Sequence, residues 1–375
     1  MNLALYLHIP YCKQKCPYCD FNSYDNGINK DFVTALKEEI QLKSKKTGQH
    51  QIGSIFFGGG TPTTLSSNQI TDILNFCFKN FSIASDCEIS IETNPGTIDY
   101  QYLKILRENG FNRLSLGSQS FNDNLLKKIG RIHNCDEIYR SFSAAQESGF
   151  ENISLDLMFG LPGQAPEMWA DTLQKATHLK PAHLSVYNLT IEKDTPFYDQ
   201  LRKKFLILPS EELQLKMYQM AVEYLSHSGY IHYEISNFAM NGYECRHNKV
   251  YWNNNEYLGF GPGAASYLKG TRTMTVLSPE EYIRILLNKK EIPLLETEIL
   301  NQKRRMGETL MLGLRMVDGI WLRDFERKFG ISIDSQFGEK IRKLRDEQLL
   351  HYANDRLKLT RKGILYSNEV FVELV

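Results

Sequence analysis

Three cysteines near the amino terminus have the spacing that most clearly indicates chemistry. Cys12, Cys16 and Cys19 form the pattern C-x3-C-x2-C directly after the apolar stretch 3–10. Three thiolates spaced in this way can bind three corners of a cubic four-iron cluster, which leaves the fourth iron open to a small molecule. Structural zinc sites and ordinary ferredoxin clusters normally have four protein ligands. The pattern therefore predicts a catalytic or sensing metal centre.

The same three thiols fit two other interpretations. A zinc knuckle could be completed by His8 or Asp20, because zinc accepts sulfur, nitrogen and carboxylate ligands. The cysteines could also be unrelated buried thiols. The motif alone leaves both alternatives open, so the rest of the chain has to decide between them.

The composition limits the class of protein. A chain of 375 residues can form one domain of roughly 250 residues and a smaller one. Lys+Arg and Asp+Glu both number 44, so the net charge favours neither nucleic acid nor an anionic membrane as a partner. Seven scattered cysteines, no secretory signal pattern and no long apolar run indicate a soluble protein of a reducing compartment, the cytoplasm.

The first part of the chain alternates short apolar runs with longer helical patterns. Strands are predicted at 3–9, 54–57, 88–93, 113–118, 152–158, 183–189 and 230–236, and helices near 30–46, 67–79, 99–109, 135–148, 166–178 and 211–228. This βα repeat requires a parallel sheet with helical crossovers. The fold class is therefore α/β, with a full or partial barrel over residues 1–238.

After residue 240 the pattern changes. Residues 241–275 are rich in Gly, Asn and aromatic residues without a clear period, and from Ser278 the chain is predicted to be mostly helical. The segment 239–297 is therefore predicted to be an irregular stretch and a connector. In the region 298–375, helices at 321–329 and 335–345 precede a hairpin at 349–359, which predicts a small, mainly helical, winged-helix-like domain. Residues 322–362 hold 11 Lys/Arg against 7 Asp/Glu, too small an excess to predict a phosphate-binding face.

Glycine and polar residues follow almost every predicted strand of the repeat. In parallel βα folds, ligands bind at the carboxyl ends of the strands. This edge would carry the turn 58–61, Glu92, Gln119 and Asp156. Each has a purely structural alternative, since tight turns need glycine and Glu92 could cap a helix. Arg131 by itself would be a surface cation.

Taken together, these residues resemble the radical S-adenosylmethionine (SAM) family of oxygen-independent coproporphyrinogen III oxidase-like proteins. The resemblance runs essentially from end to end and implies an open, partial (β/α)6-type barrel with a [4Fe-4S] cluster. It also implies that SAM binds the open iron. The SAM contacts that it implies are Tyr6, Gly59, Gly60, Thr61, Glu92, Gln119, Arg131 and Asp156.

Within this family the sequence departs from the oxidase branch. Oxidases of the family have a further cysteine two places after the last cluster cysteine, where this chain has Phe21. They also have a long extension before the first strand. Because the first cluster cysteine of this chain is already residue 12, we expect no such extension here. The run 247–252 instead resembles the H-N-x-x-Y-W motif of the haem chaperone (HemW) branch, and 257–264 is also similar to it.

The motif contains candidate haem-binding residues. His247 is a candidate axial ligand, because imidazole is the commonest proximal ligand of haem iron. Tyr251 and Trp252 could stack on the porphyrin. Cys245 is a second possible ligand of the iron, or an attachment site for a vinyl group. No C-x-x-C-H motif supports covalent attachment. The alternative is that His247 is a hydrogen-bonded structural residue.

The resemblance implies a haem chaperone that binds haem and delivers it to acceptor haemoproteins. The alternative is an oxidase-like radical SAM enzyme acting on a tetrapyrrole, in which the cluster reduces SAM and the resulting radical takes hydrogen from the substrate. A nucleic-acid modifier would need a basic face, which the composition does not supply. A homodimer and a transient contact with a membrane during haem delivery are further expectations.

Overall fold

The computed structural model describes residues 3–45, 47–48 and 50–375. The parallel strands of the repeat are β1 (Leu3–Ile9), β2 (Gln51–Gly59), β3 (Ser82–Thr93), β4 (Arg113–Gln119), β5 (Asn152–Phe159) and β6 (His183–Asn188). The helices between and after them are α1 (Phe32–Ser44), α2 (Ser67–Asn80), α3 (Tyr100–Glu108), α4 (Asp123–Lys128), α5 (Cys135–Glu147), α6 (Pro166–His178), α7 (Pro196–Arg202) and α8 (Glu211–His227). Neighbouring strands from β1 to β6 pair in parallel, which confirms the predicted open barrel.

The two faces of this sheet differ in chemistry. Alternate residues of each strand, such as Leu5, Leu7 and Ile55, join the apolar core beneath the helices. The residues between them are largely polar and lie on the concave face. Those on the concave face include Tyr6, Ser54, Glu88, Ser90, Glu92, Arg113, Ser115, Ser154, Asp156 and His183. This alternation with period two packs the helices on one side and leaves polar groups for a site on the other.

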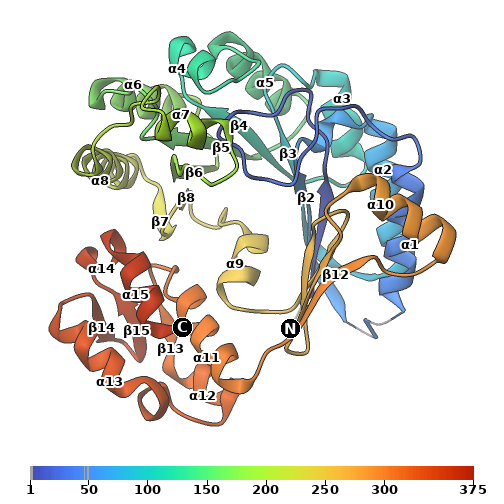
Figure 1. Cartoon of the computed structure of the whole chain (residues 1–375). Coiled ribbons are helices and arrows are strands. Elements are labelled where there is room, and N and C mark those ends of the chain that lie inside the picture. The colour runs from blue at the N-terminus through green and yellow to red at the C-terminus, as the bar shows by residue number, and fades with distance from the viewer. Residues whose placement is uncertain (1–2, 46, 49) are drawn as a thin grey trace.

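Caps in the sequence begin and end the covering helices. Ser66 and Asn134 form capping boxes with Gln69 and Glu137 at the starts of α2 and α5. Gly149 follows α5 with a φ of 92°, a conformation that residues with a side chain rarely adopt. The helices lie along the outside of the curved sheet in Figure 1.

The segment predicted to be irregular is instead ordered and extends the sheet. Just before it, β7 (Ile231–Glu234) covers most of the strand predicted at 230–236, and β8 (Asn237–Ala239) pairs with β7. The segment itself contains α9 (Arg246–Trp252), β9 (Tyr257–Phe260), β10 (Ala265–Leu268), β11 (Thr271–Thr275), α10 (Pro279–Arg284), the π-helical turn Ile285–Lys289 and the first part of β12 (Leu294–Ile299). Within the described residues, the sheet has twelve strands in the order β12-β11-β10-β9-β1-β2-β3-β4-β5-β6-β8-β7. The segment had no visible period because most of its strands have only three to five residues.

The carboxyl-terminal region has the predicted winged-helix-like order. It contains α11 (Gln302–Gly313), β13 (Ile320–Trp321), α12 (Leu322–Phe329), α13 (Ile333–Asp346), β14 (Leu350–Ala353), β15 (Arg356–Leu359), α14 (Arg361–Leu365) and α15 (Ser367–Leu374). Asn354 and Asp355 both have positive φ, 51° and 58°, and make the two-residue turn between β14 and β15. We call this region the carboxyl-terminal module.

The carboxyl-terminal module lies at the open side of the barrel, next to α9 (Figure 1). Backbone hydrogen bonds join it to the β7–β8 turn, from Ile235 N–H to Arg315 O at 3.1 Å and from Val317 N–H to Tyr233 O at 3.1 Å. Strands β9 to β12 belong to the same sheet as β1 to β6, so the sheet continues past the predicted domain boundary at residue 238. The predicted domain boundaries at residues 238 and 298 stay predictions. No helix in the described part of the chain has the length and apolar character needed to cross a membrane.

Candidate functional site at the carboxyl ends of the strands

The cysteine loop lies beyond the carboxyl end of β1 and against the turn that follows β2. The backbone N–H of Cys12 donates to Tyr24 O at 2.8 Å, and Gly60 N–H donates to Ile9 O at 2.9 Å. The thiol of Cys12 lies 3.5 Å from the hydroxyl of Thr61. The predicted metal loop and the predicted glycine turn are therefore neighbours.

The three thiols of the cysteine loop lie in partly buried surroundings that also contain polar and charged groups. Burial raises the pKa of Cys12 and of Cys19, partly offset for Cys12 by the hydroxyl of Thr61. Arg131 Nη1 donates to Cys16 Sγ at 3.7 Å. Among the described residues, no three His, Cys, Asp or Glu side chains converge on one metal ion. Ligands of a cubane bind separate irons and need not converge in this way, so the cluster stays a prediction.

The glycine turn brings backbone amides close to the cysteine loop. Gly59 has a φ of +113°, and a Cβ atom there would lie 2.8 Å from the imidazole of His8. A Cβ atom on Gly60 would lie 2.6 Å from Tyr11 O. Both positions therefore require glycine. The N–H of Gly59 donates to Glu92 Oε2 at 3.3 Å.

Glu92 shares the concave face with a second carboxyl group, Asp156. Burial, together with the charge of Asp156, raises the pKa of Glu92 to about 8. Burial also raises the pKa of Asp156, although hydrogen bonds from serine hydroxyls oppose this. One of these donors is Ser115 Oγ, 3.0 Å from Asp156 Oδ1. An adjacent cationic or hydroxyl-bearing ligand would relieve the repulsion between the two carboxyl groups.

Arg131 links this edge to the cysteine loop. Its Nη2 donates to Gly117 O at 2.7 Å and to the side chain of Asn94. Its Nε is buried and has no hydrogen-bond partner among the described residues. Gln119 lies nearby, with its amide nitrogen 3.2 Å from where a Cβ atom of Gly117 would be. Gln119 itself has a φ of 62°, an uncommon conformation for a residue with a side chain.

The structure therefore brings most of the predicted SAM contacts to one edge of the sheet. Gly59, Gly60, Thr61, Gln119 and Arg131 lie at this edge, beside the cysteine loop. Glu92, Tyr6 and Asp156 lie deeper on the concave face. A Cβ atom on Gly58 would be 3.0 Å from both Glu92 Oε2 and Tyr6 Cε2, so these two side chains are also neighbours.

Comparisons with known proteins agree with this architecture. Residues 6–176 match the model of the radical SAM superfamily, and residues 300–366 match that of the HemN C-terminal domain. The solved structure of coproporphyrinogen III oxidase (HemN) from Escherichia coli, a radical SAM enzyme, superimposes with a TM-score of 0.85 at 25% identity. That match covers 100% of this chain and 90% of the other.

Curated relatives decide the family. Heme chaperone HemW of Bacillus subtilis is 41% identical over 371 residues, which cover 98% of each chain. Heme chaperone HemW of Lactococcus lactis is 37% identical and covers 98% of this chain and 96% of the relative. The chain belongs to the HemW family.

In this chain, the H-N-x-x-Y-W motif forms α9, which lies against the concave face. His247 is 1% exposed and stacks on Phe56 of β2, with ring centroids 5.0 Å apart. Its Nδ1 is 3.0 Å from Ser54 Oγ, and its Nε2 is 3.0 Å from the hydroxyl of Tyr251. Burial lowers the pKa of His247 to about 3, so the ring is neutral at physiological pH. Axial ligation by His247 would require one of these hydrogen bonds to break.

The other candidate haem-binding residues have separate surroundings. Tyr251 packs edge-on against Tyr257, with ring centroids 4.7 Å apart. Trp252 lies under the guanidinium of Arg315, 4.4 Å from the ring centroid. Cys245 is buried, and burial raises its pKa to about 12. Of these residues, only Trp252 lines the large cavity described below.

Three further residues that contact this site or hold the motif helix were not among the predicted site residues. Asn94 donates to Thr61 Oγ1 at 2.8 Å and also contacts Arg131. Arg113 is buried on the concave face, where its charge opposes the rise in the pKa of Asp156. Glu88 accepts the N–H groups that begin α9. Asn94 could have been found from its place after a strand, and Arg113 and Glu88 from their charges within apolar strands.

Proposed function

We propose that the chain is a haem chaperone, which binds haem and transfers it to acceptor haemoproteins on a radical SAM scaffold. The observation that supports this proposal is the full-length similarity to proteins named Heme chaperone HemW, at 41% and 37% identity. The position of Phe21, where the oxidase branch has a cysteine, agrees with it. The homodimer and the membrane contact stay predictions.

We further propose that Cys12, Cys16 and Cys19 hold a [4Fe-4S] cluster whose open iron binds SAM. When bound, this pair supplies one-electron reduction of SAM. The residues present fit these groups: Arg131 has a buried Nε without a partner among the described residues, and its N–H can donate to the SAM carboxylate. Glu92 and Asp156, both with raised pKa, can accept hydrogen bonds from ligand hydroxyl groups or balance a cation.

The surrounding residues contribute the other SAM contacts in this proposal. Gly59 and Gly60 leave room for a ligand to approach the backbone, and Thr61, Gln119 and Tyr6 offer polar side-chain atoms. Together, these residues would orient SAM and limit the access of water. Haem binding and SAM turnover have different readouts, a haem absorption spectrum and the products of SAM cleavage, so the two can be measured separately.

The test is a haem titration of the anaerobically reconstituted protein, followed by absorption spectroscopy. We expect a saturable haem spectrum and transfer of the bound haem to a haem-free acceptor, for which apomyoglobin is a convenient probe. Coproporphyrinogen III is offered in a parallel assay with SAM and a reductant. Conversion of that substrate without saturable haem binding would favour the oxidase alternative. The similarity of the fold to that of HemN, an oxidase, is the reason for testing this alternative.

A further inference from the structure

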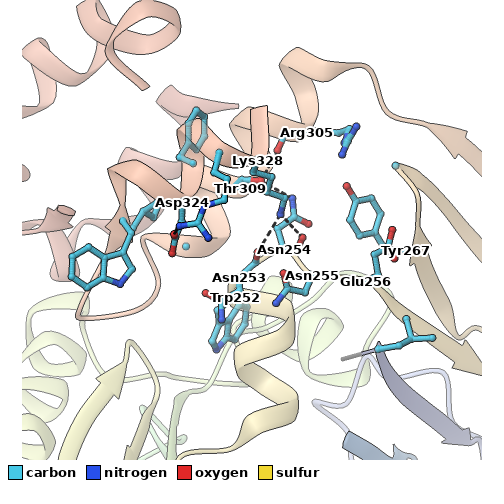
Figure 2. A pocket seen from close by; sticks show the side chains of 18 of the residues that line it. Trp252, Asn253, Asn254, Asn255, Glu256, Tyr267, Arg305, Thr309, Asp324 and Lys328 are labelled. Carbon is cyan, nitrogen blue, oxygen red and sulfur yellow. Dashed lines mark hydrogen bonds and ion pairs between the residues drawn. The ribbon is translucent and has the colours of Figure 1, made fainter. Parts of the chain in front are cut away.

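A large cavity lies at the end of the barrel opposite the cysteine loop. Its volume is about 640 Å³, within the range of about 300–1,000 Å³ usual for small-molecule sites. Leu3 and His50 line it from the beginnings of β1 and β2, and Asn255 and Glu256 from the segment before β9. The opposite wall belongs to the carboxyl-terminal module. Figure 2 shows the side chains around this cavity.

Two cations in the cavity lack a carboxylate partner. Arg305 and Lys328 line it, and neither forms an ion pair within the described residues. The ammonium of Lys328 donates only to backbone carbonyls, including Asn254 O at 2.8 Å (Figure 2). Arg305 Nε is buried without a hydrogen-bond partner in the same part of the chain. Arg327 also lines the cavity but is paired with Asp324 at 2.7 Å.

These two cations affect each other. Partial burial of the ammonium, together with the charge of Arg305, lowers the pKa of Lys328 to about 8, although the charge of Glu256 opposes the shift. Two unneutralised cations in one partly enclosed cavity repel each other unless an anion joins them. Their arrangement favours a ligand with more than one negative charge.

The walls of the cavity favour a flat, largely apolar ligand. Trp252 and Trp321 both line it, and each indole has a guanidinium over one face. Arg315 lies 4.4 Å from the ring centroid of Trp252, and Arg356 lies 3.8 Å from that of Trp321. These cation–π contacts hold the indoles in place. Indoles fixed in this way offer large apolar surfaces to an aromatic macrocycle.

The cavity also contains an imidazole. His50 lies directly before β2, and its ring makes no hydrogen bond to another described residue, in contrast to His247. A histidine that lines a cavity with both nitrogens available can bind iron without disturbing the fold.

We infer that this cavity is the haem site, with Arg305 and Lys328 binding the two propionates, Trp252 and Trp321 contacting the macrocycle, and His50 binding the iron. The inference rests on the proposed haem-binding function. The seven residues of β1 separate the cavity from the cysteine loop by about 20 Å. Haem in the cavity is therefore remote from SAM, which suits storage and transfer rather than radical chemistry on the macrocycle.

The experiment compares variants of the full-length, reconstituted protein in a haem titration. Arg305→Gln/Lys328→Gln removes both cations, and Lys303→Gln/Arg323→Gln removes two cations from the same helices outside the cavity. We expect the first pair to raise the Kd at least about tenfold, because each lost contact is charge-assisted, and the control pair to leave it unchanged. His50→Ala should abolish the histidine-ligated spectrum. Circular dichroism verifies that each variant is folded.

Iron-free protoporphyrin IX provides a second readout. Its binding should depend on Arg305 and Lys328 but be unaffected by His50→Ala, since no metal is present. If both cavity variants bind haem like the wild type while His247→Ala abolishes binding, the cavity assignment is overturned and the motif histidine is the ligand. If the wild type shows no saturable haem binding, the proposed function fails as well, and this outcome is distinct from the first.

Discussion

The carboxylate of Glu88 accepts a hydrogen bond from the backbone N–H of His247 at 3.0 Å. Its second oxygen accepts the N–H of Arg246, also at 3.0 Å. One side chain of β3 thus holds the beginning of α9, which inserts His247 between Ser54 and Tyr251. The position of the H-N-x-x-Y-W motif depends on a residue 159 positions earlier in the chain.

We predict that Glu88→Gln loosens α9. The amide can accept at only one of its two positions, and an unpaired buried group costs about 1–3 kcal/mol of the free energy of unfolding. Urea denaturation measures this loss, and hydrogen exchange of the Arg246 and His247 amides should become faster. Glu223→Gln, at an exposed position of α8, serves as the control and should change neither quantity. Unchanged exchange in Glu88→Gln would contradict the role assigned to Glu88.

Gly117→Ala should disturb the SAM edge. The added Cβ atom would lie 2.9 Å from Asn94 Oδ1 and 3.3 Å from Arg131 Nη2, so both side chains have to move. We expect weaker SAM binding by equilibrium dialysis and a loss of stability of about 1–3 kcal/mol. The matched control is Gly338→Ala in α13, where the nearest atom would be 4.0 Å away. SAM binding as strong as in the wild type would argue against Arg131 as a SAM contact.

The raised pKa of Glu92 predicts a pH dependence of stability in the SAM-free protein. In the unfolded chain Glu92 ionises near 4.5, whereas in the folded protein its pKa is about 8. Between these values the folded state holds a proton that the unfolded state has lost, so the free energy of unfolding falls as the pH rises. Glu92→Gln should flatten this slope between about pH 5 and 8, as measured by urea denaturation, whereas Glu108→Gln on the surface should not. An equal slope in both variants would contradict the assigned pKa.

Replacing Cys12, Cys16 and Cys19 together by Ala should abolish the four-iron absorbance and the bound iron. Because thiolate ligation often contributes to folding, we also expect lower solubility of this variant. Cys135→Ser, outside the cysteine loop, should keep the full iron content. If the triple variant still bound iron, or if the wild type bound zinc instead, the cluster assignment would be wrong.

The parallel repeat could be predicted from the sequence because its strands are apolar runs separated by capped helices. The predicted start of every strand from β1 to β6 lies within six residues of its observed start. The glycine turn and the polar residues after the strands could be predicted for the same reason, since parallel strands bring their carboxyl ends to one edge.

The sheet extension and the surroundings of His247 could not be predicted in this way. Strands β9 and β10 have four residues each, and β9 pairs with β1 across some 250 residues of chain. The two hydrogen bonds of the His247 ring depend on Ser54, from a distant strand, and on Tyr251, one turn further along α9. The contacts of β9 with β1 and of His247 with Ser54 are long-range, and such contacts leave no local period in the sequence.

The last strand of the sheet, β12, has consequences for how the protein behaves at high concentration. An open strand edge is a template for aggregation, and Leu294, Leu295 and Ile299 of β12 are exposed. Glu298 of the same strand forms ion pairs with Arg272 and Arg304, which place charge along this edge. Removing these charges would leave an uncharged, apolar strand edge, through which strands of different molecules could pair and form insoluble assemblies.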